Sequence, residues 1–269
     1  MSNESETHKL VQEQFGPVAA AYTLSIGHAN PEALQQVVVL AQPQPTDHAL
    51  DIATGAGHTA LALAPHVAQV IAYDLTPQML EETNRNATER GLANLQTQQG
   101  PAEALPFAKN SFEIVTCRTA AHHFADIKQA VAEMARVITS GGRVVVVDTT
   151  VPEDDRLDQE INYLEKLRDP SHIRNYRPSE WSTMFEEVGL KVTYLAQDHY
   201  TEQGHMNFIN WTSRIRTSGE AVTELAQLFR QASPALQVAL EITFRGDKDE
   251  DIFFTLPKVT IVGQKVTRI

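Results

Sequence analysis

Two adjacent histidines, His122 and His123, could act in proton transfer. An imidazole ionises near neutral pH, so it can take a proton from a hydroxyl, a thiol or a carbon acid. Both directly follow the apolar segment 112–118. We predict that at least one of them contacts a substrate or acts in catalysis. The alternative is structural: one ring packs against Phe124 or hydrogen-bonds a loop carbonyl.

A polar segment, 168–176, gathers side chains that could bind an acidic substrate. Arginine offers a two-pronged donor to a carboxylate or phosphate, and aromatic rings add stacking surface. The candidate substrate contacts are His28, in an N-terminal loop, and Arg168, His172, Arg174 and Tyr176. The alternative is a solvated loop whose cations pair with acidic groups on the surface.

Cys117 is the only cysteine, so the chain can form no internal disulfide, as in a reducing compartment. We expect it to be a core residue. Its spacing to the two histidines matches no known ligand framework, and we predict no metal site. The acidic turn 246–251 is typical of a solvated hairpin and not of a calcium site.

The strongest binding signal is Asp51-x-x-x-Gly55-x-Gly57 at the end of a short apolar segment. Glycines let a backbone turn sharply and approach a ligand closely. In open α/β sheets, ligands bind at the carboxyl ends of strands. Asp74 ends the next apolar segment, where a carboxylate can accept both hydroxyls of a ribose.

A nicotinamide site would use similar parts, and Gly55-x-Gly57-x-x-Ala60 nearly matches the dinucleotide pattern. However, Asp51 stands where such sites usually carry an apolar residue. An acid beside a glycine turn is better suited to an ammonium and a carboxylate than to a pyrophosphate.

Strand-like and helix-like segments alternate around these residues. We predict strands over 48–53, 70–73, 95–98, 112–118, 143–148, 190–200 and 258–266. We predict helices over 4–20 (interrupted at 15–17), 31–41, 59–64, 76–90, 127–138, 155–167 and 179–189, with further helical segments between 205 and 240. Asn30 and Thr76 are the expected N-caps of two of them, each followed by proline. The pair Gly141-Gly142 is expected to turn the chain from helix into strand.

This alternation predicts an α/β fold: a doubly wound, mostly parallel seven-stranded sheet with helices on both faces. N-terminal and C-terminal helical lid elements are added to it. We expect one domain over 1–269, with a lid at 1–30, a cofactor-binding core at 31–152, and substrate-side helices and the last strands at 153–269.

The charge balance favours a small-molecule substrate. The formal net charge is −12, from 22 basic and 34 acidic residues. This disfavours nucleic acid, whose binding needs a basic surface, and anionic membranes. The first residues lack a basic and apolar signal, and no apolar run could span a bilayer, so we expect a cytoplasmic protein.

Four segments together resemble class I S-adenosylmethionine-dependent methyltransferases, in the subgroup of ubiquinone and menaquinone biosynthesis enzymes. The matching segments, strongest between about 15 and 148, are 49–64, 70–80, 99–107 and 111–117, with 136–143 before the fifth strand. The resemblance implies S-adenosylmethionine as cofactor and S-adenosylhomocysteine as product. It implies cofactor contacts from Tyr22, Asp51, Ala53, Thr54, Gly55, Gly57, Asp74, Leu75, Met79, Ala102, Glu103, Arg118 and Thr119.

One position departs from the family pattern. Where relatives commonly have an aspartate that accepts a hydrogen bond from the adenine amino group, this chain has Pro101. Gln99, Glu103 or a water would have to supply that acceptor.

The expected activity is methyl transfer to a small molecule. It is an in-line displacement governed by alignment, with His-assisted deprotonation where the acceptor must lose a proton. The alternatives are a nicotinamide-dependent oxidoreductase and a non-catalytic, cofactor-binding regulatory or partner protein.

Overall fold

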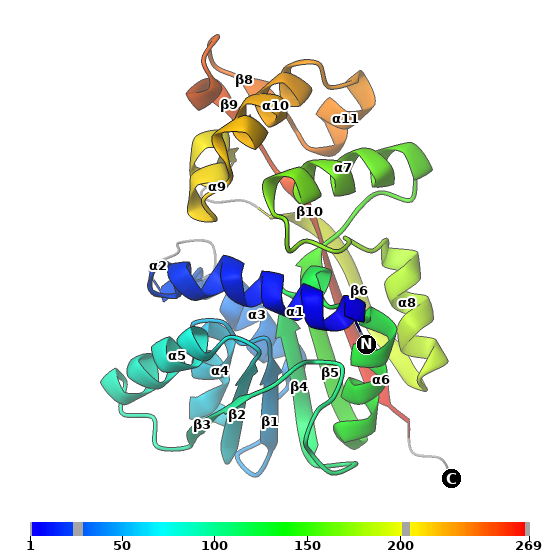
Figure 1. The fold of residues 1–269 in the computed structure, drawn as a ribbon. Helices are drawn as coiled ribbons and strands as arrows, with labels where there is room; N and C mark the ends of the chain where they lie inside the picture. The colour runs from blue at the N-terminus through cyan, green and yellow to red at the C-terminus, as the bar shows by residue number, and fades with distance from the viewer. Residues whose placement is uncertain (1, 24–28, 201–204, 267–269) are drawn as a thin grey trace.

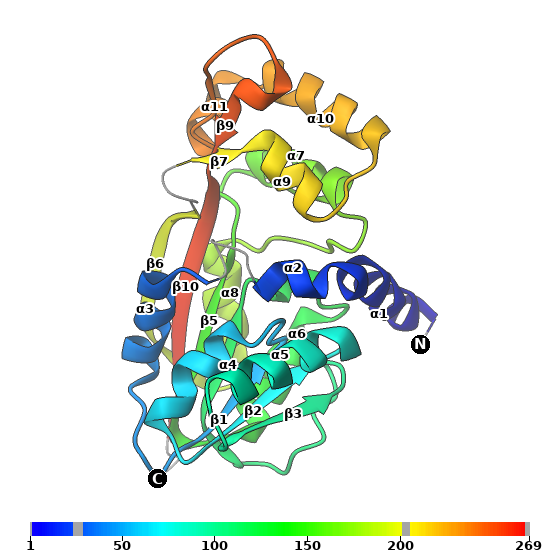
Figure 2. The same ribbon diagram turned by 90° about the vertical axis from the view of Figure 1, so that its left-hand side faces the viewer.

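The computed structural model describes residues 2–23, 29–200 and 205–266. It has a lower sheet layer and an upper cap, with the N-terminal helices between them (Figures 1 and 2). In the described residues, no helix is long and apolar enough to cross a membrane.

The lower layer is a mostly parallel seven-stranded sheet, as predicted, and its strand order is β3-β2-β1-β4-β5-β10-β6. Only β10 runs antiparallel to its neighbours. The strands are β1 (His48–Ile52), β2 (Gln69–Asp74), β3 (Leu95–Gln99), β4 (Phe112–Arg118), β5 (Ile138–Thr149), β6 (Leu190–Tyr200) and β10 (Leu256–Lys265). Successive strands are therefore added on one side of β1 up to β3 and on its other side from β4 onward. Doubly wound folds bind ligands at such a switch point.

Helices cover both faces of this sheet because its central strands are apolar on both sides. One face buries α3 (Pro31–Ala41), α4 (His58–Leu63) and α5 (Pro77–Glu89). The other buries α6 (Ile127–Val137) and α8 (Pro178–Glu187). Short 3-10 turns follow α4 at Ala64–His66 and β4 at Ala121–His123. As predicted, the Asn30 side chain caps α3 by accepting from two backbone N–H groups.

The cap lies above the carboxyl ends of β4 and β5 (Figure 1). It contains α7 (Asp155–Arg168), α9 (Phe208–Arg214), α10 (Gly219–Arg230) and α11 (Pro234–Ala239). It also contains a small sheet of β7 (Met206–Asn207), β9 (Ile252–Phe254) and β8 (Thr243–Phe244), with a 3-10 turn at Asp249–Asp251. The sequence did not predict this sheet, since its strands are two or three residues long. A separate apolar cluster around Trp211, Phe229 and Phe254 holds the cap together.

The N-terminal segment forms α1 (Ser2–Phe15), a 3-10 turn (Gly16–Val18) and α2 (Ala19–Thr23). The interruption at Gly16-Pro17 was predicted. The Gln12 side chain donates to the carbonyl of Leu75, and the Gln14 side chain donates to that of Ile215. Helix α1 therefore joins the sheet layer to the cap.

One local prediction was wrong. Strand β5 begins at Ile138, and Gly141-Gly142 lies inside it, where the pairing of β4 with β5 shifts register. The φ of +82° at Gly141 bends the strand without ending it. Thr76 precedes α5 as expected, but its side chain makes no cap hydrogen bond.

Candidate functional site

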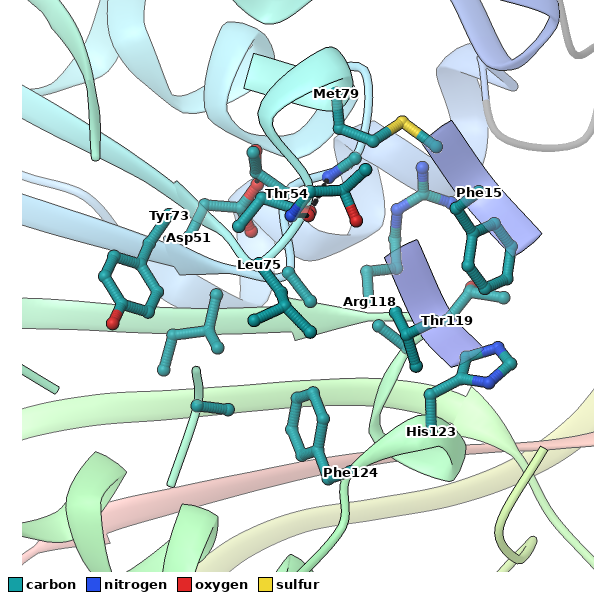
Figure 3. A pocket seen from close by; sticks show the side chains of 18 of the residues that line it. Phe15, Asp51, Thr54, Tyr73, Leu75, Met79, Arg118, Thr119, His123 and Phe124 are labelled. Carbon is teal, nitrogen blue, oxygen red and sulfur yellow. Dashed lines mark hydrogen bonds between the residues drawn. The ribbon is translucent and has the colours of Figure 1, made fainter. Parts of the chain in front are cut away.

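The principal cavity is lined by residues at the carboxyl ends of β1, β2 and β4 and by residues of α1 (Figure 3). It encloses about 960 Å³ of empty space, including its open mouth. Its lining includes every expected cofactor contact except Gly57: Tyr22, Asp51, Ala53, Thr54, Gly55, Asp74, Leu75, Met79, Ala102, Glu103, Arg118 and Thr119. The fold thus gathers residues from five separate segments into one site.

Gly57 belongs to the same turn as Gly55 but does not line the cavity. Both glycines are left-handed, with φ of +56° at Gly55 and +86° at Gly57. A Cβ on Gly57 would lie 2.7 Å from Cγ2 of Thr83, whose hydroxyl donates to the carbonyl of Gly55. No atom lies within 4 Å of a Cβ added at Gly55. Gly55 thus leaves open space at the cavity wall, whereas Gly57 permits close packing on α5.

Asp51 is 1% exposed and its carboxylate organises the turn. One oxygen accepts from the hydroxyl of Thr54 at 2.6 Å and from the N–H of Ala60 at 3.2 Å. The other accepts from the hydroxyl of Thr116 at 2.6 Å. Burial raises the pKa of Asp51, against these hydrogen bonds and the charge of Arg118.

Asp74 lies at the end of β2 and lines the cavity. Its two oxygens accept from the N–H groups of Gly55 and Thr76, each at 2.8 Å. Burial raises its pKa to about 6. Each oxygen keeps further lone-pair capacity, so the carboxylate can also accept from a bound ligand.

Part of the cavity wall is apolar and includes Leu75, Met79, Ala102 and Phe124; Figure 3 labels three of these, Leu75, Met79 and Phe124. The side chain of Glu103 is buried beside them. A flat, apolar ring system suits such a wall, with polar contacts confined to its edge.

The opposite end of the cavity carries Arg118 and Thr119, beside Phe15 and His123 (Figure 3). The Nε of Arg118 donates to the hydroxyl of Thr59 at 3.1 Å. Thr119 has a φ of +57°, an uncommon value for a residue other than glycine. Such strained conformations cluster at functional sites.

A second cavity, of about 590 Å³, adjoins the first. Four residues, Phe15, Tyr22, Thr119 and His123, line both. The rest of its wall comes from His122, Thr149, Glu165, Arg168, Asp169, Met206, Trp211, Arg214, Ile215 and Leu256. The second cavity thus lies between the sheet layer and the cap.

His122 is paired with a buried acid at the end of β5. Its Nδ1 lies 2.6 Å from one oxygen of Asp148, and its backbone N–H donates to the other oxygen at 2.9 Å. Burial by itself would lower the pKa of His122. The charge and hydrogen bond of Asp148 raise it above its usual value.

His123 has a different environment. Its Nδ1 lies 3.2 Å from the hydroxyl oxygen of Ser171, which donates to Asp169 at 2.6 Å. Burial, and then the charge of His122, lower its pKa to about 4. The ring packs edge-on against Phe15 with 4.9 Å between ring centroids. His123 is therefore neutral at physiological pH, at the junction of the two cavities.

The segment 168–176 is not a solvated loop. Arg168 lines the second cavity, 4.7 Å above the ring of Trp211. His172 is buried, and its Nε2 lies 3.1 Å from the side-chain oxygen of Asn162. Arg174 pairs with Asp158 and Glu180.

Tyr176 packs against Trp181, with 5.9 Å between the ring centroids. Of the four candidates in this segment, only Arg168 lines either cavity. His28 lies outside the described residues. In the part of the chain that the structure describes, no three His, Cys, Asp or Glu side chains are grouped to hold a metal ion. Cys117 is buried in the core, as expected.

Sequence reasoning missed several lining residues, among them His8, Phe15, Glu165 and Trp211, and it also missed Asp148, the buried partner of His122. Asp148 ends the apolar segment 143–148, as Asp74 ends its own strand, and that shared position was a usable signal. The residues of the cap carried none, because their place over the sheet depends on long-range packing.

The comparisons with known proteins agree on a family. Residues 50–146 match a family model described as a methyltransferase domain. The chain is 38% identical over 237 residues to the uncharacterized methyltransferase YcgJ of Bacillus subtilis, covering 88% of this chain and 92% of that protein. The crystal structure of YcgJ superposes with a TM-score of 0.81, covering 88% of this chain and 99% of YcgJ.

A more distant relative is the ubiquinone/menaquinone biosynthesis C-methyltransferase of Zymomonas mobilis. It is 34% identical over 148 residues, which cover 53% of this chain and 60% of that protein. The similarity to this relative is thus confined to part of each chain.

Proposed function

Since the chain belongs to the family of S-adenosylmethionine-dependent methyltransferases, we propose that the principal cavity holds the cofactor and the second cavity holds a small-molecule methyl acceptor. The observation that carries this proposal is the wall that the two cavities share. A donor in one cavity and an acceptor in the other would meet at Thr119 and His123.

The residues of the principal cavity suit the three parts of the cofactor. Asp74 offers a carboxylate to the ribose hydroxyls. Leu75, Met79 and Ala102 offer an apolar slot to adenine. The backbone at Gly55 leaves space for the methionine part of the cofactor. The buried Asp51 holds that turn through Thr54 and supplies a negative charge nearby.

When bound, the cofactor supplies an electrophilic methyl group on a sulfonium. The chain's main contribution is alignment of an acceptor atom with that group, which is the largest demand of an in-line displacement. Phe15 and Tyr22 line both cavities at this junction.

Where the acceptor must lose a proton, we assign its removal to His122. Nδ1 of His122 keeps its own proton in the hydrogen bond to Asp148. Nε2 is therefore the nitrogen that takes the proton from the methyl-accepting substrate. The acceptor atom's electron pair forms the bond to the methyl carbon, and the electrons of the broken bond stay on sulfur. The neutral His123 can then accept a hydrogen bond from the same substrate.

Two buried groups of the second cavity point to the acceptor's polarity. Among the described residues, Oε1 of Glu165 and Nε1 of Trp211 have no hydrogen-bond partner, and both residues line this cavity. Unpartnered buried polar atoms are costly. A methyl-accepting substrate with one hydrogen-bond donor for Oε1 of Glu165 and one hydrogen-bond acceptor for Nε1 of Trp211 would satisfy both buried atoms.

Two measurements test the proposal. Calorimetry should detect binding of S-adenosylmethionine and S-adenosylhomocysteine, and no binding of either at millimolar concentration would refute it. A metabolite screen for release of S-adenosylhomocysteine should then identify the acceptor. Cofactor binding without turnover on any acceptor would favour the non-catalytic alternative.

A further inference from the structure

We propose that His8 and Glu103 together bind the amino group of adenine, in place of the acidic side chain that Pro101 does not provide. The site lies at the edge of the principal cavity, where α1 meets the segment after β3. The inference concerns selection of the cofactor and is independent of the acceptor.

Other acceptors at this edge are already used or lie elsewhere. The carbonyl of Pro101 accepts from the hydroxyl of Tyr73 at 3.2 Å and from the N–H of Ala104 at 3.3 Å. Gln99 is exposed, its side-chain nitrogen donates to the carbonyl of Leu75, and it does not line the cavity.

Glu103 retains one uncommitted oxygen. Its Oε1 accepts from the N–H groups of Ala125 and Asp126, at 2.8 and 3.3 Å. Its Oε2 lies 3.4 Å from Nε2 of His8. Because the carboxylate is held by the two backbone groups, Oε2 has a fixed position beside the cavity.

His8 brings a second acceptor from α1. Its Nε2 is buried and has no hydrogen-bond partner within the described residues. One turn further along α1, Gln12 binds the carbonyl of Leu75 and so holds this helix on the cavity. An imidazole nitrogen without a proton accepts one hydrogen bond.

The chemistry of the pair matches an exocyclic amino group. Such a group carries two N–H donors. Oε2 of Glu103 accepts one, and Nε2 of His8 accepts the other in the tautomer whose ring proton is on Nδ1. A carbonyl at the same position of the purine would instead face a carboxylate oxygen and a nitrogen lone pair. The pair should therefore favour adenine over a 6-oxopurine.

The test is a calorimetric titration of the full chain with S-adenosylhomocysteine and with S-inosylhomocysteine, in which oxygen replaces the amino group. We expect wild-type protein to prefer the adenine ligand by about 10- to 100-fold. His8→Phe, which keeps a ring but removes both nitrogens, should weaken binding of the adenine ligand about tenfold and leave the inosine ligand nearly unchanged.

His66→Phe is the matched control, because His66 is exposed and outside the cavity; its two affinities should equal those of wild type. Glu103→Gln should also reduce the preference for the adenine ligand over the inosine ligand, because a neutral amide oxygen replaces a charged carboxylate oxygen as hydrogen-bond acceptor. An equal loss for both ligands in His8→Phe would overturn the proposal and make His8 a packing residue. An unchanged preference in both variants would overturn it as well.

Failure here is separable from failure of the proposed function. Absence of S-adenosylhomocysteine binding by wild-type protein would overturn this inference together with the cofactor assignment. Adenine-selective binding that depends on His8, in a protein without turnover, would support the inference and refute only the catalytic proposal.

Discussion

The side chain and the backbone of His122 bind the two oxygens of a single carboxylate, that of Asp148. This double contact fixes both the orientation of the ring and the nitrogen that carries its proton. Asp148 is 2% exposed, so its charge acts on the imidazole with little screening by solvent.

The first prediction concerns this pair and the pH dependence of turnover. The neutral form of His122 is the proposed base, so kcat should rise with pH through a midpoint above 6.5, because Asp148 raises the pKa. Asp148→Asn removes that charge, so the midpoint should move to lower pH. Loss of the oriented base should also lower kcat by about 10²- to 10⁴-fold.

The measurement is a pH–rate profile with an acceptor found in the metabolite screen. Asp198→Asn, on an exposed part of β6, is the matched control and should leave the profile unchanged. An unshifted midpoint in Asp148→Asn, at unchanged cofactor affinity, would remove His122 from the role of base.

The second prediction concerns Asp74 and cofactor affinity. Burial raises the pKa of Asp74 to about 6, and the ribose hydroxyls should prefer its ionised form. Affinity for S-adenosylhomocysteine should therefore be full above pH 7 and fall as the pH drops through about 6. Below that value the loss approaches tenfold per pH unit, since one proton competes with the ligand.

Asp74→Asn should weaken binding about 10- to 100-fold at pH 8 and flatten the pH dependence. Calorimetric titrations between pH 5 and 8 provide the data. Asp47→Asn, at a partly exposed site outside the cavity, should retain the wild-type curve. A slope that persists in Asp74→Asn would assign the titration to another group.

The third prediction separates two costs at Gly57. Gly57→Ala adds both a positive φ for a residue with a Cβ and a clash with Thr83, whereas Gly91→Ala adds only the first. Gly91→Ala should cost about 1 kcal/mol in the free energy of unfolding, and Gly57→Ala clearly more.

Urea unfolding of the two variants measures both costs. Combining Gly57→Ala with Thr83→Ser removes Cγ2 of Thr83, the nearest clashing atom, and should restore part of the difference. Equal destabilisation by the two single alanine variants would mean that the Thr83 contact has no weight.

The fourth prediction concerns Glu165. We expect its buried carboxylate to bind the methyl-accepting substrate and to lower the stability of the native state. Burial raises its pKa, so the native state disfavours the ionised carboxylate despite Arg168 nearby. Relative to wild type, Glu165→Gln should therefore gain stability as the pH rises from acid to neutral, because only the wild-type carboxyl ionises. The gain should shrink at acid pH, where the wild-type carboxyl is itself protonated.

The same variant should raise KM for the acceptor and leave S-adenosylhomocysteine affinity intact, because Glu165 lines only the second cavity. Thermal unfolding and steady-state kinetics check the two halves. Lower Tm with unchanged KM would make Glu165 a structural partner of Arg168 only.

The proposed cofactor half of the site could be predicted from the sequence because its determinants are local. The turn around Gly55 and Gly57 needs particular residues at fixed spacing. Asp51 and Asp74 lie in or at the end of strands that periodicity reveals, so the doubly wound sheet and most of the cavity wall could be predicted.

The proposed acceptor half of the site was decided by tertiary structure. The pairing of His122 with Asp148 joins two strand ends 26 positions apart, and Glu165 and Trp211 reach the cavity only through the packing of the cap. Arg174 and Tyr176 lie in the same polar segment as Arg168. However, Arg174 forms an ion pair and Tyr176 an aromatic contact outside the cavity. Spacing along a chain does not encode which of several similar side chains long-range packing will bring to a cavity.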